Sequence, residues 1–282
     1  MKQNSNKTAI SRTIFTVLIF FVLSGNILSQ NSSEGKIFKS PINQLILKGD
    51  ITVYITQGTE QRIYFDGTSN AVKQIKFSIN NKILTLSKQH SLNNERVTAF
   101  LTIKNLESIK TFGNVEIETP SNIWIKKLSL NFSKETDAIF FFNTNQLDLT
   151  VAGSGNLYIS GNIDILKILG TAEAKITGNI KSNQLSCRAF NSCNIILTGS
   201  VYNSFVSAFN QSSIDLADCK SIKSSIVVFD YSKVKVNSKY VTDIWAFDNS
   251  SISYFSTKLP LIMENSINAQ IIKGSYKEIA KK

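Results

Sequence analysis

A degenerate repeat of about 19 residues, running from Ile109 to near the C-terminus, constrains the fold of this chain more than any other feature. One apolar residue anchors each repeat, and the residues six and eight positions later are also apolar every time. The anchors are Ile109, Phe132, Val151, Ile168, Ala189, Ala208, Val228, Ala246 and Met263. An apolar register that returns at this period predicts stacked coils, each of which buries its inner face against the next.

The positions around each anchor predict the shape of one coil. The residues two positions before the anchors are apolar from Leu130 onward, which indicates a strand with alternating inward and outward side chains. Two positions after the anchors come residues that tolerate a left-handed backbone, namely Gly153, Gly170, Asn191, Asn210, Asp230, Asp248 and Asn265. The sequence therefore predicts an all-β fold, a parallel β-helix of about nine coils with equivalent residues about 4.8 Å apart.

The first 29 residues have the layout of a secretory signal peptide. Lys2, Lys7 and Arg12 precede an apolar run at residues 14–23, which is too short to span a bilayer, and small or polar residues follow. We expect cleavage after Ser29, with Gly25 as a second choice. The mature protein is then exported to the periplasm or the outer cell surface, without a transmembrane segment.

The charge of the chain does not by itself indicate a partner. The net charge of +11 falls to +8 when the three basic residues of the signal peptide are removed. A basic exported protein can favour anionic glycans, but no three basic residues are consecutive and no nucleic-acid-binding motif is present. We interpret most lysines as solvated side chains at edges and bends, and we expect no nucleic-acid partner.

The residues before the repeats predict a cap. Strand-like alternation between residues 36 and 105 lacks the repeat, and Asn80–Asn81 is typical of a tight hairpin. We divide the chain into a signal peptide (1–29), an N-terminal β cap (30–108), β-helix repeats (109–274) and a polar tail (275–282). No long amphipathic helix is expected.

Three segments resemble a known family. They are residues 49–58 (Gly-Asp-Ile-Thr-Val-Tyr-Ile-Thr-Gln-Gly), residues 106–109 (Leu-Glu-Ser-Ile) and residues 152–156 (Ala-Gly-Ser-Gly-Asn). The family is that of bacterial proteins called putative auto-transporter adhesin, head GIN domain, which is common in Bacteroidetes. The resemblance implies a right-handed β-helix in an exported, adhesin-like protein. Only one Gly-Ser-Gly turn is kept, and Phe-Asn or Phe-Asp bends replace the others.

Two of the three cysteines fit the interior of the coils. Cys187 occupies an inward position that other repeats fill with leucine, and Cys193 occupies an inward position reserved for small residues. A buried free cysteine behaves as a small hydrophobic residue. We expect a free thiol at Cys187. The odd count of three flags possible pairing, and a Cys187–Cys193 disulfide within one coil stays open.

The sequence offers little material for catalysis or metal binding. His90 is the sole histidine and falls in a polar loop, so we expect no metal site, no cofactor and no catalytic residue. The enzymatic alternative is a polysaccharide lyase or hydrolase that uses Asp230 and Asp248 on adjacent coils, about 4.8 Å apart and near the separation in retaining glycosidases. Both aspartates, however, stand at bends that favour aspartate for backbone reasons, and no third acid joins them.

An apolar stripe is the sharper candidate for a binding site. It lies at positions that alternation directs outward and consists of Leu169, Phe190, Phe209, Val227, Phe229, Trp245 and Phe247. Exposed, the stripe would form a self-association or partner surface or a platform for sugar rings. Alternatively, the chain turns at this bend and packs the phenyl rings into the core.

These observations leave three functions open. The first is a non-enzymatic, exported binding or adhesin-like module at the cell envelope, with an envelope protein, a glycan or a second copy as its partner. The second is a periplasmic structural or regulatory protein that acts through a protein partner. The enzymatic reading is the third.

Overall fold

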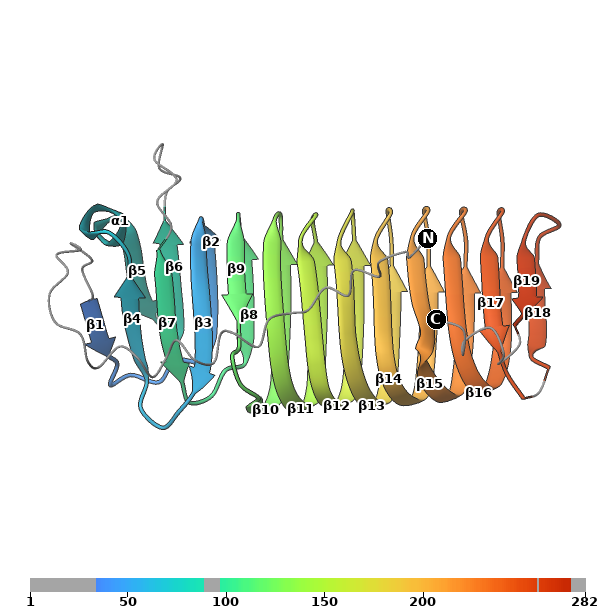
Figure 1. Ribbon diagram of the computed structural model, residues 1–282, viewed down its shortest axis with the longest axis horizontal. Helices are drawn as coiled ribbons and strands as arrows, with labels where there is room; N and C mark the ends of the chain where they lie inside the picture. Colours follow the sequence, from blue (N-terminus) through green and yellow to red (C-terminus); the bar gives the residue numbers. More distant parts are fainter. Residues whose placement is uncertain (1–33, 89–96, 258, 275–282) are drawn as a thin grey trace, which may run out of the picture. The chain divides into compact units, whose positions relative to one another are not determined.

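The computed structural model describes residues 34–88, 97–257 and 259–274, which belong to a single compact unit. Within these residues nineteen strands form one hydrogen-bonded sheet that winds into a β-solenoid of about nine turns (Figure 1). The all-β solenoid predicted from the repeat is thereby confirmed. The predicted signal peptide, His90, the polar tail and the side chain of the Met263 anchor lie outside the described residues.

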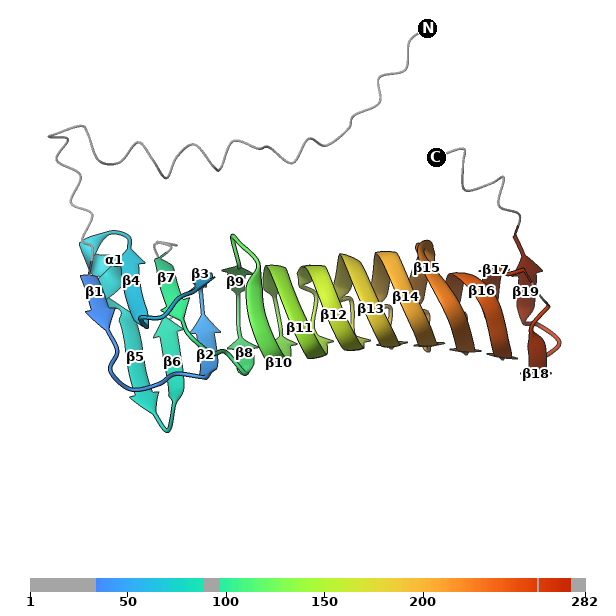
Figure 2. The same ribbon diagram turned by 90° about the horizontal axis from the view of Figure 1, so that it is seen from below.

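The repeated part consists of the long strands β10 to β16, which bend around the solenoid, followed by three short strands. All of them pair in parallel with strands of neighbouring turns. These strands follow one another along the solenoid in sequence order, as the two views in Figures 1 and 2 show. They are β10 (Ile123–Ser133), β11 (Thr136–Ala152), β12 (Asn156–Thr171), β13 (Lys175–Ala189), β14 (Asn194–Ala208), β15 (Ser213–Val228), β16 (Lys233–Ala246), β17 (Ser251–Phe255), β18 (Leu261–Asn265) and β19 (Gln270–Lys273).

The core consists of apolar columns that run along the solenoid. In one of them Leu130 pairs with Leu149, Leu149 with Ile168, and Ile168 with Cys187. All four side chains are at most 2% exposed. Since complete burial of one such aliphatic side chain contributes about 1.5–3 kcal/mol, stacking of like positions supplies most of the driving force for this fold.

The register differs from the predicted one at three anchors. At the last of them, Met263, the structure pairs Ala246 with Asn265 instead, next to an irregularity in the ladder. The other two are Ile109 and Ile168. Ile109 pairs with Leu130, and Ile168 pairs with Cys187, so each stands two residues before the column assigned to it. Gly170 holds the true position beside Ala189. A Cβ atom on Gly170 would lie 2.3 Å from the Sγ atom of Cys193, so a larger residue would require Cys193 to shift, and the apolar pattern breaks there.

One corner of the solenoid is a stack of tight turns with a left-handed backbone. Both central residues of four successive turns have positive φ, as in type I′ turns: Asn191 and Ser192, Asn210 and Gln211, Asp230 and Tyr231, and Asp248 and Asn249. Neighbouring turns are joined by backbone hydrogen bonds, such as that from Gln211 N to Asp230 O at 2.8 Å. The predicted bends are therefore correct here, whereas the bend expected at Gly170 falls at Ala172 (φ 59°).

The N-terminal strands form turns that do not follow sequence order. One turn consists of β2 (Gln44–Gly49) and β3 (Ile51–Gln57). On one side it pairs with a turn made of β6 (Ile83–Lys88) and β7 (Thr98–Ile103). On the other side it pairs with a turn made of β8 (Ser108–Phe112) and β9 (Val115–Glu118). The parallel ladders continue without interruption from β2 and β3 to β8 and β9. Residues 44–57 are therefore an internal turn of the solenoid.

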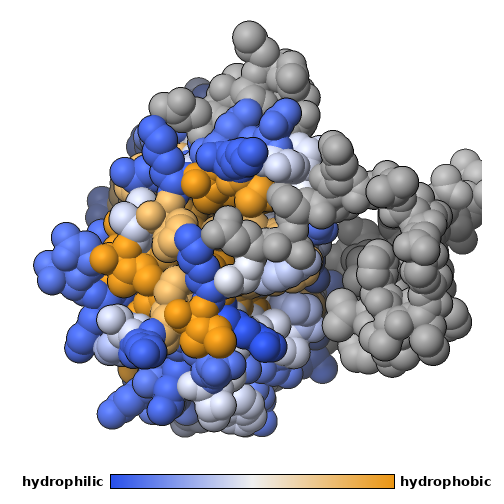
Figure 3. Space-filling model, turned by 90° about the vertical axis from the view of Figure 1, so that its left-hand side faces the viewer, coloured by the Kyte–Doolittle hydropathy of each residue, from blue (hydrophilic) through white to orange (hydrophobic). Residues whose placement is uncertain are grey.

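Antiparallel strands cover the N-terminal end of the stack. β4 (Arg62–Asp66) pairs with β7, β5 (Ile75–Asn80) pairs with β6, and β1 (Glu34–Ile37) pairs with β4. The helix α1 (Ser69–Lys73) connects β4 to β5, and the β5–β6 hairpin turns at Asn81 and Lys82, one residue later than predicted. Figure 3 shows this end, where apolar side chains gather inside a polar rim.

All three cysteines are free and buried. Cys187 and Cys193 occupy the inward positions that the repeat predicted, with no solvent exposure. Burial raises the pKa of the Cys193 and Cys219 thiols to about 12 and raises that of Cys187 further. The thiols are therefore neutral packing groups at physiological pH.

Candidate functional site

Four residues of the predicted apolar stripe form a continuous column, the Phe ladder, which consists of Phe190, Phe209, Phe229 and Phe247. Successive rings are nearly parallel, with centroids 4.8, 5.4 and 4.6 Å apart. Each side chain is half-buried. The ladder thus lies between the two predicted alternatives, since it belongs neither to the sealed core nor to a freely exposed surface.

The remaining residues of the stripe belong to the neighbouring column. Leu169 pairs with Arg188, and Val227 pairs with Trp245. The prediction that Leu169 precedes Phe190 in one column is wrong, because it inherits the two-residue error at Ile168. Leu169, Val227 and Trp245 are half-buried, like the phenyl rings beside them.

The geometry of the Phe ladder limits what it can bind. Because the rings stack face to face, only their edges are turned toward solvent along the column. A sugar ring packs against an aromatic face, so the ladder is unsuited to be a sugar platform along its length. Its stacking contacts instead stabilise the corner of the solenoid.

Asp230 and Asp248, the candidate catalytic pair, serve the turns. Both occupy the first left-handed position of a tight turn, with φ of 54° and 53°. Aspartate is favoured at such positions because its short side chain tolerates this backbone. In the part of the chain that the structure describes, no group of three or more His, Cys, Asp or Glu residues is arranged to hold a metal ion.

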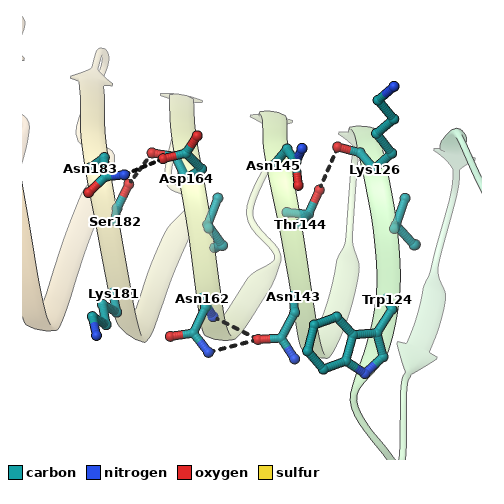
Figure 4. Close-up of a pocket in the computed structure, with 12 residues that line it drawn as sticks. Trp124, Lys126, Asn143, Thr144, Asn145, Asn162, Asp164, Lys181, Ser182 and Asn183 are labelled. Atoms are coloured by element: carbon teal, nitrogen blue, oxygen red, sulfur yellow. Dashed lines mark hydrogen bonds between the residues drawn. The ribbon is translucent and has the colours of Figure 1, made fainter.

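A different surface carries the features of a binding site. At the second corner, over β10, β11, β12 and β13, a hollow of about 530 Å³ opens to solvent. We call it the Trp124 groove, and Figure 4 shows its side chains. Its lining residues are Trp124, Ile125, Lys126, Asn143, Thr144, Asn145, Asn162, Ile163, Asp164, Lys181, Ser182 and Asn183.

Two rows of outward side chains form the walls of the Trp124 groove (Figure 4). The first row runs through Trp124, Asn143, Asn162 and Lys181, which are paired on successive strands. The second contains Lys126, Asn145, Asp164 and Asn183. Between the rows lie Ile125, Thr144, Ile163 and Ser182, of which the last three are buried. Each turn of the solenoid therefore contributes one residue to each wall and one to the floor.

Trp124 is highly exposed and firmly held. Its side chain is 70% exposed, whereas the preceding Ile123 is buried in the core. The side-chain amide of Gln57 forms two hydrogen bonds to the Trp124 backbone, donating to its carbonyl oxygen and accepting from its N–H, both at 2.8 Å. The indole thus projects into solvent from an anchored backbone.

Hydrogen bonds also fix the polar walls and the floor. Asn143 Oδ1 accepts from the backbone N–H and from the Nδ2 of Asn162, at 3.3 and 2.9 Å. Asn183 Nδ2 donates to Asp164 Oδ1, and the Ser182 hydroxyl donates to the Asp164 carbonyl oxygen at 3.1 Å. These contacts join neighbouring turns, so the groove is preformed.

Our sequence interpretation did not identify the Trp124 groove. One signal was present: Trp124 stands between two isoleucines in an alternating strand, a position that directs the indole outward. The polar walls had no comparable signal. Asn143, Asn162 and Asp164 fall at bends, where such residues are common for conformational reasons.

A second hollow, of about 430 Å³, lies on another face of the solenoid. Tyr54, Glu116, Glu118, Ile139 and Tyr158 are among its lining residues. The pKa of Tyr54 is raised by burial, and then by the carboxylates of Glu118 and Glu116. Tyr54 therefore offers a neutral hydroxyl at physiological pH.

Comparison with known proteins agrees with this fold. Residues 42–178 match the model of the family described as putative auto-transporter adhesin, head GIN domain. All three segments that carried the resemblance lie within this range, so the resemblance is confirmed. The comparison with curated proteins finds no match.

Three of the solved structures with a similar fold come from the genus Parabacteroides. A putative adhesin from Parabacteroides merdae superposes with a TM-score of 0.63 at 14% identity, covering 88% of this chain and 98% of its own. A putative adhesin from Parabacteroides distasonis gives 0.61 at 14% identity, with coverages of 87% and 94%. A putative lipid binding protein from the same species gives 0.59 at 14% identity, with 86% and 97%. At this identity the likeness concerns the fold alone.

Proposed function

Because residues 42–178 belong to the family of putative auto-transporter adhesins with a head GIN domain, we propose that this protein is an exported, non-enzymatic binding module of the bacterial cell envelope. The signal-peptide pattern of residues 1–29 supports export. Within the described residues, no helix combines the length and apolar character needed to cross a membrane. A preformed surface on a stiff scaffold is suited to binding.

The observation that carries this proposal is the exposure of Trp124 beside a preformed polar groove. Tryptophan is enriched among the residues that dominate binding energies, because one indole buries a large area at low conformational cost. The Gln57 hydrogen bonds reduce that cost further by holding the backbone in place. We therefore assign the principal binding surface to the Trp124 groove.

The apolar stripe supports a second binding surface. Its half-buried residues run continuously over several turns, and partly exposed apolar patches of this kind mark contacts between proteins. We assign this surface to self-association. Sedimentation of the mature protein and of a Val227→Ser variant tests it: a dimer that dissociates in the variant supports the assignment, and a monomeric wild-type protein excludes it.

Measurement of cell binding tests the principal proposal. The mature chain (residues 30–282) is fluorescently labelled, and its binding to intact cells and to isolated envelopes is titrated. We expect Trp124→Ala to weaken the saturable binding at least tenfold. Tyr231→Ala is the matched control, because Tyr231 is also an exposed aromatic residue (61%) but stands at the opposite corner. Equal binding by wild type and Trp124→Ala would exclude the groove as the principal surface.

Export and the absence of catalysis require separate tests. Cell fractionation of the full-length chain should recover a shortened protein outside the cytoplasm; recovery of the full-length chain in the cytoplasm would contradict export. Incubation with polysaccharides should release no reducing ends or unsaturated products. Cleavage by wild type that is lost in Asp230→Asn would instead favour the enzymatic alternative.

A further inference from the structure

Resting on the proposed function, we propose that the Trp124 groove binds a linear oligosaccharide that lies along the solenoid, with about one sugar residue per turn. The groove combines an exposed indole, two walls of hydrogen-bonding side chains and the repeat distance of the sheet. Each of these three features corresponds to one property of a sugar chain.

The indole supplies the apolar contact. One face of a pyranose ring carries mainly C–H groups, and such a face packs against an aromatic ring. Trp124 is 70% exposed and stands at one end of its row, followed by Asn143 and not by another aromatic residue (Figure 4). Its ring is therefore not enclosed in an aromatic stack, in contrast to the inner rings of the Phe ladder.

The walls supply donors and acceptors for sugar hydroxyls. A hydroxyl group both donates and accepts hydrogen bonds, so it pairs with amides and carboxylates. The hydrogen bonds between Asn143 and Asn162 use Oδ1 of Asn143 and, from Asn162, the backbone N–H and Nδ2. Asn143 Nδ2 and Asn162 Oδ1 thus keep one donor and one acceptor for a ligand on adjacent turns.

The spacing of the turns sets the direction of the ligand. Strands of neighbouring turns are about 4.8 Å apart, close to the length of one pyranose residue in an extended chain. The walls take one residue from each of β10, β11, β12 and β13, which corresponds to a groove about 14 Å long. A tetrasaccharide would therefore meet one pair of wall residues at each sugar residue: Trp124 and Lys126 in the first turn, and two polar side chains in each of the other three turns.

The backbone and the charges of the groove disfavour other ligand classes. A peptide cannot add to these strands by β-augmentation, because each of β11, β12 and β13 already has a parallel neighbour on both sides. The walls carry two positive charges, on Lys126 and Lys181, and one negative charge, on Asp164, whereas a nucleic-acid site is strongly basic. An apolar ligand would leave the asparagines of both walls unsatisfied.

Fluorescence titration provides a direct test. The chain contains two tryptophans, so the Trp245→Phe variant of the mature protein keeps Trp124 as its only indole. The probes are linear tetrasaccharides and disaccharides of β-1,4-linked glucose, N-acetylglucosamine and a uronic acid. We expect at least one tetrasaccharide to shift the Trp124 emission to shorter wavelength, and the matching disaccharide to bind at least tenfold more weakly.

Variants in the wild-type background, studied by calorimetry, complete the experiment. Trp124→Ala should abolish binding of the tetrasaccharide, Asn162→Ala should weaken it severalfold, and Tyr231→Ala should leave it unchanged. Sugar binding that survives in Trp124→Ala would overturn the proposed site. If no probe binds while binding to cells still depends on Trp124, the oligosaccharide assignment is wrong and the proposed function stands. If no probe binds and binding to cells does not depend on Trp124, both proposals are wrong.

Discussion

The side-chain amide of Gln57 bridges the backbone N–H and the backbone carbonyl of Trp124, 67 residues further along the chain. This contact links the internal N-terminal turn formed by β2 and β3 to the first strand of the groove. The two hydrogen bonds replace a backbone partner that the strand lacks at this point. The position of the indole thus depends on a residue from another part of the sequence.

Loss of the Gln57 amide should loosen Trp124 without removing it. Each of the two hydrogen bonds contributes about 0.5–1.5 kcal/mol, so we expect Gln57→Ala to lower the free energy of unfolding by about 1–3 kcal/mol. Binding to cells should weaken by less than in Trp124→Ala. Urea denaturation and the labelled-cell titration measure the two effects. An unchanged affinity would show that the Gln57 bonds do not prepare the indole for binding.

A charge in an apolar column should be far more damaging than a charge on the surface of the same strand. Leu149 is 2% exposed and stacks between Leu130 and Ile168, so Leu149→Asp should cost more than about 4 kcal/mol. Ala152→Asp, at an exposed position of β11, is the control and should cost less than about 1 kcal/mol. If circular dichroism gave both variants the same thermal midpoint, the column would be refuted.

The Phe ladder allows the contribution of one stacking contact to be isolated. Phe209 stacks on two rings, Phe190 and Phe229, whereas Phe190 stacks on one. An aromatic pair contributes about 0.5–1.5 kcal/mol beyond its buried area. Phe209→Leu should therefore lower the free energy of unfolding by about that much more than Phe190→Leu does. Equal losses in urea denaturation would mean that burial alone stabilises the ladder.

The left-handed corner offers a stabilising substitution. Gln211 has φ of 61° in the second central position of its turn, where glycine is unstrained and Asn-Gly is the preferred pair. Gln211→Gly should raise the free energy of unfolding by about 0.5–1 kcal/mol. Ser213→Gly, at the first residue of β15, should lower it by a similar amount, because glycine loses more conformational freedom on folding than serine does. A destabilised Gln211→Gly variant would show that its backbone carries no strain.

The buried thiols should make the protein less stable in alkaline solution. The pKa of Cys193 is raised from 9.0 to about 12 in the folded state. Between these values the unfolded chain releases a proton that the folded chain retains, so stability falls as the pH rises. Cys193→Ala is the matched variant, since Ala174 occupies the corresponding buried position one turn away. From pH 8 to 10.5 the wild type should lose about 1–2 kcal/mol more than this variant.

The repeated part of the fold could be predicted from sequence because its signal is summed over many turns. Burial forces apolar residues into the same positions, and the left-handed corner admits few residue types, as Asn191, Asn210 and Asp230 illustrate. The prediction failed where one residue obeyed a stronger local constraint. Gly170 lies against Cys193 and has no apolar side chain, so the pattern did not mark it as an anchor. Ile168 was assigned as the anchor instead, and Leu169 was misplaced with it.

The arrangement of the N-terminal turns and the Trp124 groove could not be predicted in the same way. Strand alternation locates β2, β3, β6 and β7, but it contains no information about which strands become neighbours. The groove depends on Gln57, on the bends of four turns and on the unpaired faces of the asparagines. These relationships exist only once the register is set, and no short motif encodes them.

The insertion of residues 44–57 between later segments has a consequence for biosynthesis. These residues leave the ribosome before the strands on either side of them, and their two neighbouring ladders are complete only when residue 118 has followed. These turns cannot close strand by strand as the chain emerges, so residues 44–118 must assemble together. Each later coil then needs only its predecessor as a template, and elongation proceeds from this nucleus toward the C-terminus.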